Sequence, residues 1–175
     1  MALTILIGGA RAGKSHLAAR LAGRAGRPVT FIATAEAGDE EMEARIARHR
    51  ADRPAQWTTV EEPVHLAHAL KLAAPQDTVI VDCLTLWVSN LVLAGLDDEE
   101  IQGRAMESAA QAANREGPTF VVTNEVGSGV HPSSSLGRRF RDLLGRVNSI
   151  WADRAATALL VVAGRAIPLE VLEGP

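Results

Sequence analysis

Eight residues near the start of the chain, Gly8 to Ser15, read Gly-Gly-Ala-Arg-Ala-Gly-Lys-Ser. They match the pattern G-x-x-x-x-G-K-[ST], the phosphate-binding loop of nucleoside-triphosphate enzymes. An apolar segment, Leu3–Ile7, precedes this loop, and a segment rich in Ala, Leu and Arg, 14–24, follows it. A strand, a glycine-rich loop and a helix N-terminus form an anion site, because backbone N–H groups and the helix dipole both favour phosphate. The motif therefore predicts a fold in which a strand runs directly into a helix.

Each part of the loop has a chemical role. Gly8 and Gly13 allow a tight turn that brings backbone N–H groups against phosphate oxygens. Lys14 is expected to reach the β- and γ-phosphates, and the Ser15 hydroxyl to ligate Mg²⁺. A glycine-rich turn that only connects two elements is the alternative, and the agreement of motif and context disfavours it. The predicted phosphate loop consists of Gly8, Gly9, Ala10, Arg11, Ala12, Gly13, Lys14 and Ser15.

Apolar strand segments alternate with helical segments along the rest of the chain. The predicted strands are Leu3–Ile7, Val29–Ala33, Thr58–Val60, Val79–Asp82, Thr119–Thr123 and Ala158–Val162, with a last short strand near Leu169–Leu172. The predicted helices are 14–24, 39–52, 64–73, 84–94, 98–116 and 135–153. Continuous apolar strands that alternate with helices are typical of a mostly parallel sheet covered on both faces. We expect one α/β domain over residues 1–175, with helices on both faces of its sheet.

The amino-acid composition indicates which binding partners and which cellular compartment the protein could have. The 175-residue chain has 18 basic and 21 acidic residues, a formal net charge of −3, and no polybasic run. This disfavours nucleic acid as the main partner. The single cysteine, Cys83, excludes an internal disulfide framework and fits a reducing compartment. No apolar run reaches the roughly 18 residues that a membrane span needs, and no signal peptide is visible, so we expect a cytoplasmic protein without a membrane span.

One predicted strand, Thr78–Asp82, is apolar and ends in a carboxylate. In phosphate-loop enzymes an aspartate in this position holds Mg²⁺ from the end of a neighbouring strand. A capping role for Asp82 in the following turn is the alternative. Beside a phosphate loop, the pattern favours a magnesium site formed by Ser15 and Asp82.

The predicted helix 39–52 carries an unusual basic face. Arg45, His49 and Arg53 follow at intervals of four residues, which places them on one side of the helix. Flanking arginines would disfavour the imidazolium and keep His49 neutral, hence nucleophilic. They would also bind polyphosphate, because Arg matches phosphate geometry with paired donors. A solvated basic face without any ligand is equally compatible with this spacing.

Polar residues follow two further strands. Asn124 and Glu125 come after the strand that ends at Thr123, and Thr34 comes after Val29–Ala33. In open α/β sheets the ligand lies beyond the carboxyl ends of the strands, so these residues are candidates for the same edge. A flexible turn rich in Gly and Ser is the alternative for the segment after Asn124.

The acidic cluster that begins at Asp97 has a structural interpretation. Asp97 and Glu100 are three residues apart, as in a capping box at the start of a helix. We prefer this to a cation site, because the spacing does not fit a Ca²⁺ loop.

These motifs together resemble the bifunctional adenosylcobinamide kinase/adenosylcobinamide-phosphate guanylyltransferase family of cobalamin biosynthesis. They lie in order over nearly the whole chain, which makes the resemblance more specific than the phosphate loop alone. The residues that carry it are Gly8–Ser15, Ile32-Ala33-Thr34-Ala35, Asp39–Met42, Ala44-Arg45-Ile46, His49-Arg50, Arg53-Pro54, Trp57, Glu61, Asp82-Cys83-Leu84-Thr85, Asn90-Leu91, Thr123-Asn124-Glu125-Val126-Gly127 and Gly145-Arg146-Val147-Asn148.

The resemblance implies a fold, two activities and an assembly. The fold is a phosphate-loop domain similar to that of RecA, and the assembly is a homotrimer. The first activity phosphorylates the aminopropanol hydroxyl of adenosylcobinamide with ATP or GTP. The second transfers GMP from GTP to that phosphate, through a guanylylated histidine that matches His49, and yields adenosylcobinamide-GDP and pyrophosphate.

The family's nucleotide contacts carry over to matching positions of this sequence. Besides the phosphate loop they are Ala33, Thr34, Ala35, Arg50, Ala51, Asp52, Arg53, Glu61 and Asp82. Two other functions stay open at the level of sequence. One is a small-molecule kinase without nucleotidyl transfer. The other is a GTP-binding regulatory module, against which stands the lack of an Asn-Lys-x-Asp guanine motif.

Overall fold

A single mixed sheet organises the protein. The structure, a computed structural model, describes residues 3–36, 47, 50–51 and 53–171. Seven strands lie in the order β3-β2-β4-β5-β1-β6-β7, and every neighbouring pair is parallel except β6 with β7. The strands are β1 (Leu3–Gly8), β2 (Val29–Ala33), β3 (Thr58–Glu61), β4 (Thr78–Asp82), β5 (Thr119–Asn124), β6 (Thr157–Val162) and β7 (Arg165–Leu169).

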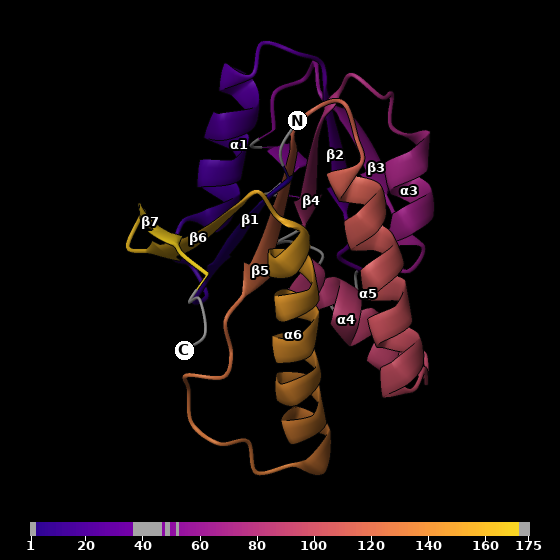
Figure 1. The fold of residues 1–175 in the computed structure, drawn as a ribbon, viewed down its shortest axis with the longest axis vertical. Coiled ribbons are helices and arrows are strands. Elements are labelled where there is room, and N and C mark those ends of the chain that lie inside the picture. The colour runs from indigo at the N-terminus through magenta and orange to yellow at the C-terminus, as the bar shows by residue number, and fades with distance from the viewer. Residues whose placement is uncertain (1–2, 37–46, 48–49, 52, 172–175) are drawn as a thin grey trace.

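Helices cover both faces of this sheet, as predicted. Those described are α1 (Lys14–Arg24), α3 (Leu66–Leu72), α4 (Leu84–Leu93), α5 (Asp98–Ala113) and α6 (Ser135–Arg154). In Figure 1 helix α1 lies to the left of the sheet, and the other four lie to its right and front. Successive strand residues alternate between the two layers: Ile5 packs with the core that contains Trp87 and Trp151, whereas Leu6 packs with Ala18 and Ala22 of α1. Among the described helices, none is both long and apolar enough to cross a membrane.

The sheet topology brings three strand ends side by side. Strand β5 lies between β1 and β4, in a register that pairs Gly8 with Asn124. The neighbouring strand β4 ends at Asp82, and all three strands point the same way. Ligands of open α/β sheets bind beyond such carboxyl ends. The phosphate loop, Asn124 and Asp82 therefore share one edge of the molecule.

Most predicted elements are confirmed to within one to three residues at each end, but the last strand is wrong. The sequence places it near Leu169–Leu172, whereas β7 spans Arg165–Leu169. Ala163 and Gly164 both have positive φ, 49° and 74°, and form a tight two-residue turn immediately after β6. The chain therefore folds back earlier than its apolar pattern indicates, and β7 pairs antiparallel with β6. The predicted helix 39–52 falls largely outside the described residues.

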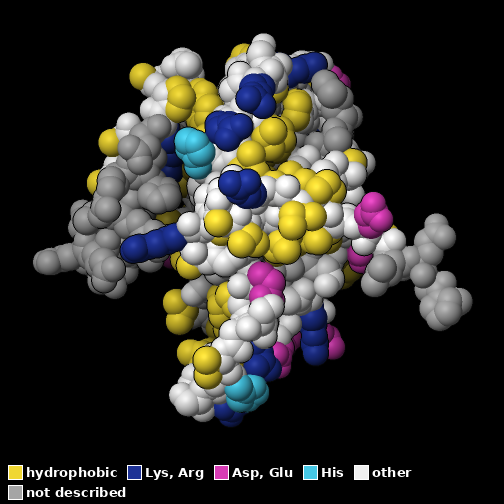
Figure 2. Space-filling model, turned by 90° about the vertical axis from the view of Figure 1, so that its left-hand side faces the viewer, with side chains coloured by type: hydrophobic (Ala, Val, Ile, Leu, Met, Phe, Trp, Pro, Cys, Tyr) yellow, Lys and Arg dark blue, Asp and Glu magenta, His cyan; other side chains and the backbone are white. Residues whose placement is uncertain are grey.

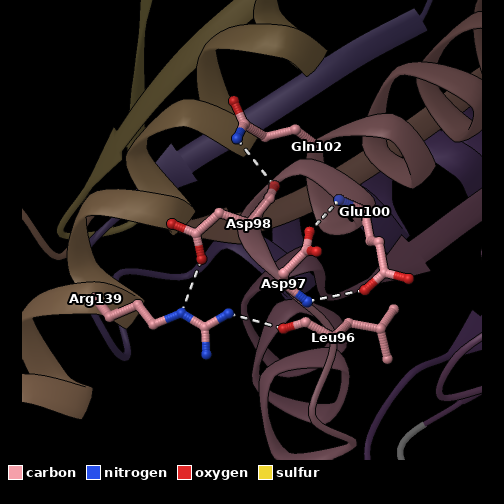
Figure 3. A network of polar contacts seen from close by, with 6 residues as sticks. All are labelled: Leu96, Asp97, Asp98, Glu100, Gln102 and Arg139. Atoms are coloured by element: carbon pink, nitrogen blue, oxygen red, sulfur yellow. Dashed lines mark hydrogen bonds and ion pairs between the residues drawn. The ribbon is translucent and has the colours of Figure 1, made fainter.

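A polar network fixes how α6 meets the start of α5 (Figure 3). Asp97 and Glu100 form the predicted capping box, each side chain accepting the other residue's backbone N–H at 2.9 Å. Arg139 of α6 donates to the Asp98 carboxylate at 2.8 Å and to the Leu96 carbonyl at 2.7 Å. The guanidinium therefore ties the long helix α6 to the turn between α4 and α5.

At the end of the sheet where β4 and β5 begin, Arg115 binds backbone carbonyls at and beyond the C-terminus of α3. Its side chain is buried, with 7% of the residue exposed. The guanidinium donates to the carbonyl oxygens of Leu70 and Ala73 through Nη1, and to those of Ala74 and Asp77 through Nη2. Helix C-termini leave carbonyls such as those of Leu70 and Ala73 without intrahelical partners, and the same guanidinium also bonds two carbonyls of the loop that leads to β4.

We expect Arg115→Met to lower the free energy of unfolding by about 2–4 kcal/mol, since two buried and two partly buried hydrogen bonds to carbonyls would lose their charged donor. Urea denaturation followed by circular dichroism measures this. Arg154→Met, at the exposed end of α6, is the matched control and should change stability by about 0.5 kcal/mol or less. Equal effects of the two substitutions would contradict this role of Arg115.

Candidate functional site

A cavity of about 350 Å³ opens at the carboxyl edge of the sheet. It lies among the phosphate loop, the ends of β2, β4 and β5, and the start of α4. Its size suits part of a nucleotide. The lining residues are Ala10, Arg11, Ala12, Gly13, Lys14, Ser15, His16, Ala33, Ala35, Arg53, Asp82, Cys83, Leu86, Val122 and Asn124.

The phosphate loop depends on glycine at two positions. Gly13 has φ 100°, in the left-handed region, and forms the N-cap of α1. A Cβ on Gly8 would overlap the carbonyl oxygen of Val161 on β6. The backbone N–H of Gly164, in the β6–β7 turn, donates to the Ala12 carbonyl at 2.8 Å. The loop is therefore held from behind by β6 and the turn that follows it.

Lys14 lies inside this loop. Its Nζ donates to the carbonyl oxygens of Gly8 at 3.0 Å and Gly9 at 2.6 Å, and only 6% of the residue is exposed. Burial lowers the pKa of Lys14, while the negative charge of Asp82 acts in the opposite direction. A buried ammonium with a carboxylate nearby is a suitable contact for phosphate oxygens.

Ser15 and Asp82 line the same cavity, from the start of α1 and the end of β4. Lys14 and Arg53 line the same cavity, and the Asp82 charge raises the pKa of both. A hydroxyl and a carboxylate are oxygen donors of the kind that Mg²⁺ prefers beside nucleotide phosphates. The donor set therefore fits the predicted metal.

Arg53 is held over the β2 end of the cavity. Its guanidinium carbon lies 3.8 Å from the centroid of the Phe31 ring, and Nη1 donates to Thr59 at 3.4 Å. Burial is the main cause of the lowered pKa of Arg53. At the exposed rim, Arg50 forms an ion pair with Glu61 at 3.2 Å. The ion pair and the stacked arginine bring three of the predicted residues to one side of the site.

The other predicted residues have different positions. Ala33 and Ala35 line the cavity, whereas Thr34 is fully buried and its hydroxyl turns to Cys83, donating to its carbonyl at 2.7 Å. Ala51 is an exposed helical residue. His49 and Asp52 lie outside the described residues, and so does Arg45.

Sequence reasoning assigned no site role to Cys83, Leu86 and Val122, all of which line the cavity. The position of Val122 could have been predicted, because it lies two residues before Asn124 on β5 and therefore on the same face of the strand. Cys83 and Leu86 follow Asp82 at the start of α4, and no motif marks them. Burial and the Asp82 charge raise the pKa of the Cys83 thiol to about 11, so it stays protonated near neutral pH.

The profile of one protein family, described as cobinamide kinase / cobinamide phosphate guanyltransferase, matches residues 4–169. The chain belongs to this family. It is 44% identical to the bifunctional adenosylcobalamin biosynthesis protein CobP of Pseudomonas aeruginosa, over 95% of this chain and 96% of that protein. It is 39% identical to the bifunctional adenosylcobalamin biosynthesis protein CobU of Escherichia coli K12, over 96% and 99%. The resemblance inferred from the motifs is confirmed.

Solved structures support the fold. The ATPase EscN of the type III secretion system of enteropathogenic E. coli superimposes with a TM-score of 0.59 and 13% identity, over 93% of this chain and 43% of that one. A Pyrococcus horikoshii protein gives a TM-score of 0.58 at 7% identity, over 98% and 87%. At such low identity the likeness concerns the fold alone. Together with the phosphate loop, it confirms the predicted α/β nucleotide-binding architecture.

We expect Lys14→Ala to reduce phosphoryl transfer from GTP by about 100-fold or more, because a preorganised cation at the phosphates is lost. The chain's other lysine, Lys71, lies exposed on α3 and provides the control. Lys71→Ala should retain the activity and affinity of the unchanged protein. Isothermal titration with GTP and Mg²⁺, combined with a phosphate-transfer assay, measures both. Unchanged turnover in Lys14→Ala would contradict the site.

Proposed function

We propose that this protein phosphorylates adenosylcobinamide with ATP or GTP and then transfers GMP from GTP to the phosphate it has made. Membership of the cobinamide kinase / cobinamide phosphate guanyltransferase family, matched over residues 4–169, carries this proposal. The cavity adds physical support, because a phosphate loop, Lys14 and Asp82 meet at one sheet edge. The products are adenosylcobinamide-GDP and pyrophosphate.

In the kinase step, the aminopropanol hydroxyl oxygen attacks the γ-phosphorus and the hydroxyl proton is released to water. A new phosphorus–oxygen bond forms, the bond to the β-phosphate bridging oxygen breaks, and the nucleoside diphosphate leaves. The phosphate loop and Lys14 hold the phosphates in line with the hydroxyl. Asn124 lies between the loop and Asp82 and would contact the transferred group from the β5 side.

In the guanylyl step, we assign the nucleophile to His49. A neutral imidazole nitrogen attacks the α-phosphorus of GTP, and the bond to the β-phosphate breaks to release pyrophosphate. An oxygen of adenosylcobinamide phosphate then attacks the same phosphorus, and the phosphorus–nitrogen bond breaks. Arg53, stacked at the cavity, would offset charge that builds on the phosphates.

Ser15 and Asp82 are the residues that would hold Mg²⁺ in this site. When bound, the metal would neutralise charge on the nucleotide phosphates. The chain's own contribution is to present two oxygen donors at one cavity wall, with Lys14 beside them.

We further propose a cytoplasmic homotrimer. Three large apolar residues of the β6–β7 hairpin, Val162, Ile167 and Leu169, are exposed by 56%, 60% and 45%. Figure 2 shows hydrophobic side chains gathered on this side of the molecule, with both basic and acidic side chains around them. Strand β7 is also one of the two edge strands of the sheet. Apolar surface beside an open edge strand favours association of subunits.

Intact-protein mass spectrometry after incubation with GTP and Mg²⁺ tests the guanylyl step. We expect a GMP adduct that is labile in acid and stable in base, as a phosphorus–nitrogen bond is. His49→Asn, which keeps polarity and approximate size without a nucleophilic nitrogen, should give no adduct.

Transfer of γ-phosphate to adenosylcobinamide should persist at least partly in His49→Asn, because the phosphate loop is intact. An adduct that persists in this variant would place the nucleophile elsewhere. If the unchanged protein has kinase activity but forms no adduct, this result would support the alternative of a small-molecule kinase without nucleotidyl transfer. GTP binding without transfer would support a regulatory module.

Sedimentation equilibrium tests the assembly. We expect three times the mass of one chain for the unchanged protein, and a smaller species for Ile167→Asp, since a charge on the apolar hairpin is costly to bury. Leu72→Asp, at an exposed apolar position on α3, is the control and should remain trimeric. A monomeric unchanged protein would contradict the assembly.

A further inference from the structure

The last residue of β5, Asn124, is held by side chains from two helices. Its backbone N–H donates to the hydroxyl oxygen of Thr85 on α4 at 2.8 Å. Its carbonyl oxygen accepts from Nδ2 of Asn148 on α6 at 3.0 Å. Both main-chain groups of Asn124 are thus engaged by side chains, where the sheet ladder of β5 ends.

The orientation of the Asn148 side chain is fixed from both ends. A carbonyl only accepts hydrogen bonds, so the amide nitrogen must face Asn124. The amide oxygen in turn accepts from the Thr123 hydroxyl at 2.7 Å. Thr123 is fully buried, and a buried hydroxyl without a partner is costly. These two hydrogen bonds therefore fix the orientation of the Asn148 carboxamide, and its amide nitrogen binds the backbone carbonyl at the end of β5.

This contact sits directly behind the phosphate site. Asn124 pairs in register with Gly8, the first residue of the phosphate loop, and the N–H of the next residue, Glu125, donates to the Gly8 carbonyl at 3.1 Å. Asn124 also lines the cavity. Its own carboxamide has no hydrogen-bond partner among the described residues, and the cavity that Asn124 lines is where a ligand would meet it.

We propose that Asn148 and Thr85 are positioning residues that aim the Asn124 carboxamide at the phosphoryl group being transferred. The inference rests on the proposed kinase step, and it adds two residues that touch no substrate. A purely structural role would lower stability and leave turnover of the folded enzyme unchanged. A positioning role lowers kcat while GTP binding, which the phosphate loop provides, is retained.

The test compares kcat and KM for GTP in adenosylcobinamide phosphorylation. Asn148→Asp keeps the acceptor for Thr123 but sets a carboxylate oxygen against the Asn124 carbonyl. Thr85→Val removes the other contact, and Thr85→Ser keeps it. We expect kcat to fall about 10-fold or more in Asn148→Asp and Thr85→Val, with KM changed by less than about 3-fold. Thr85→Ser and the control Ser149→Ala, one residue along α6, should retain the kcat of the unchanged enzyme.

A double-mutant cycle decides whether these residues act through Asn124. Asn124→Ala should itself lower kcat, and Asn148→Asp should then cost nothing further in that background. Independent, multiplicative losses would overturn the proposal, and so would a normal kcat in folded Asn148→Asp. If Asn148→Asp does not fold, Thr85→Val and Thr85→Ser in the Asn124→Ala background give the same comparison.

The same variants distinguish this inference from the proposed function. If the unchanged protein does not phosphorylate adenosylcobinamide, the proposed function fails, and the cycle is measured on GTP hydrolysis, which uses the same phosphate site. Non-additive losses there would support the positioning role on their own. Additive losses would overturn it.

Discussion

Parallel pairing of β1, β5 and β4 is the constraint on which the site depends. Because the three strands point the same way and lie side by side, their ends place the phosphate loop, Asn124 and Asp82 in a row. These groups are far apart in sequence and no local interaction brings them together. The hydrophobic clusters on both faces stabilise the sheet, and the sheet in turn positions the residues of the site.

Side chains of helix α4 form hydrogen bonds with backbone groups at this edge. Thr85 accepts from the N–H of Asn124, and Asn90 donates to the carbonyl oxygens of Thr34 and Pro63. One helix thus satisfies backbone groups at the ends of three strands, where the ladder hydrogen bonds stop. Unpaired buried backbone groups are expensive, so these side chains stabilise the fold and fix the edge at the same time.

The sequence predicted the elements and the phosphate loop well, because both depend on local patterns. Alternating apolar segments define strands and helices, and the loop motif carries its own mechanism. The start of β7 was misplaced, since the turn at Ala163 and Gly164 depends on backbone angles that apolar periodicity does not report. The roles of Thr85 and Asn148 also escaped prediction, because they arise from contacts 39 and 24 residues away in the chain. The contact of the Thr34 hydroxyl with the Cys83 carbonyl, 49 residues away in the chain, could not be read from local patterns either.

The charges of the cavity explain why a triphosphate suits it. Burial lowers the pKa of both Lys14 and Arg53, which means that desolvation disfavours their charged forms. Among the described lining residues Asp82 alone carries a carboxylate, whereas Arg11, Lys14 and Arg53 are cationic. A bound polyphosphate would supply the missing negative charge, raise the pKa of both cations and stabilise the folded state in proportion to its affinity. A nucleotide polyphosphate is therefore the kind of anion that the described cations of this cavity suit.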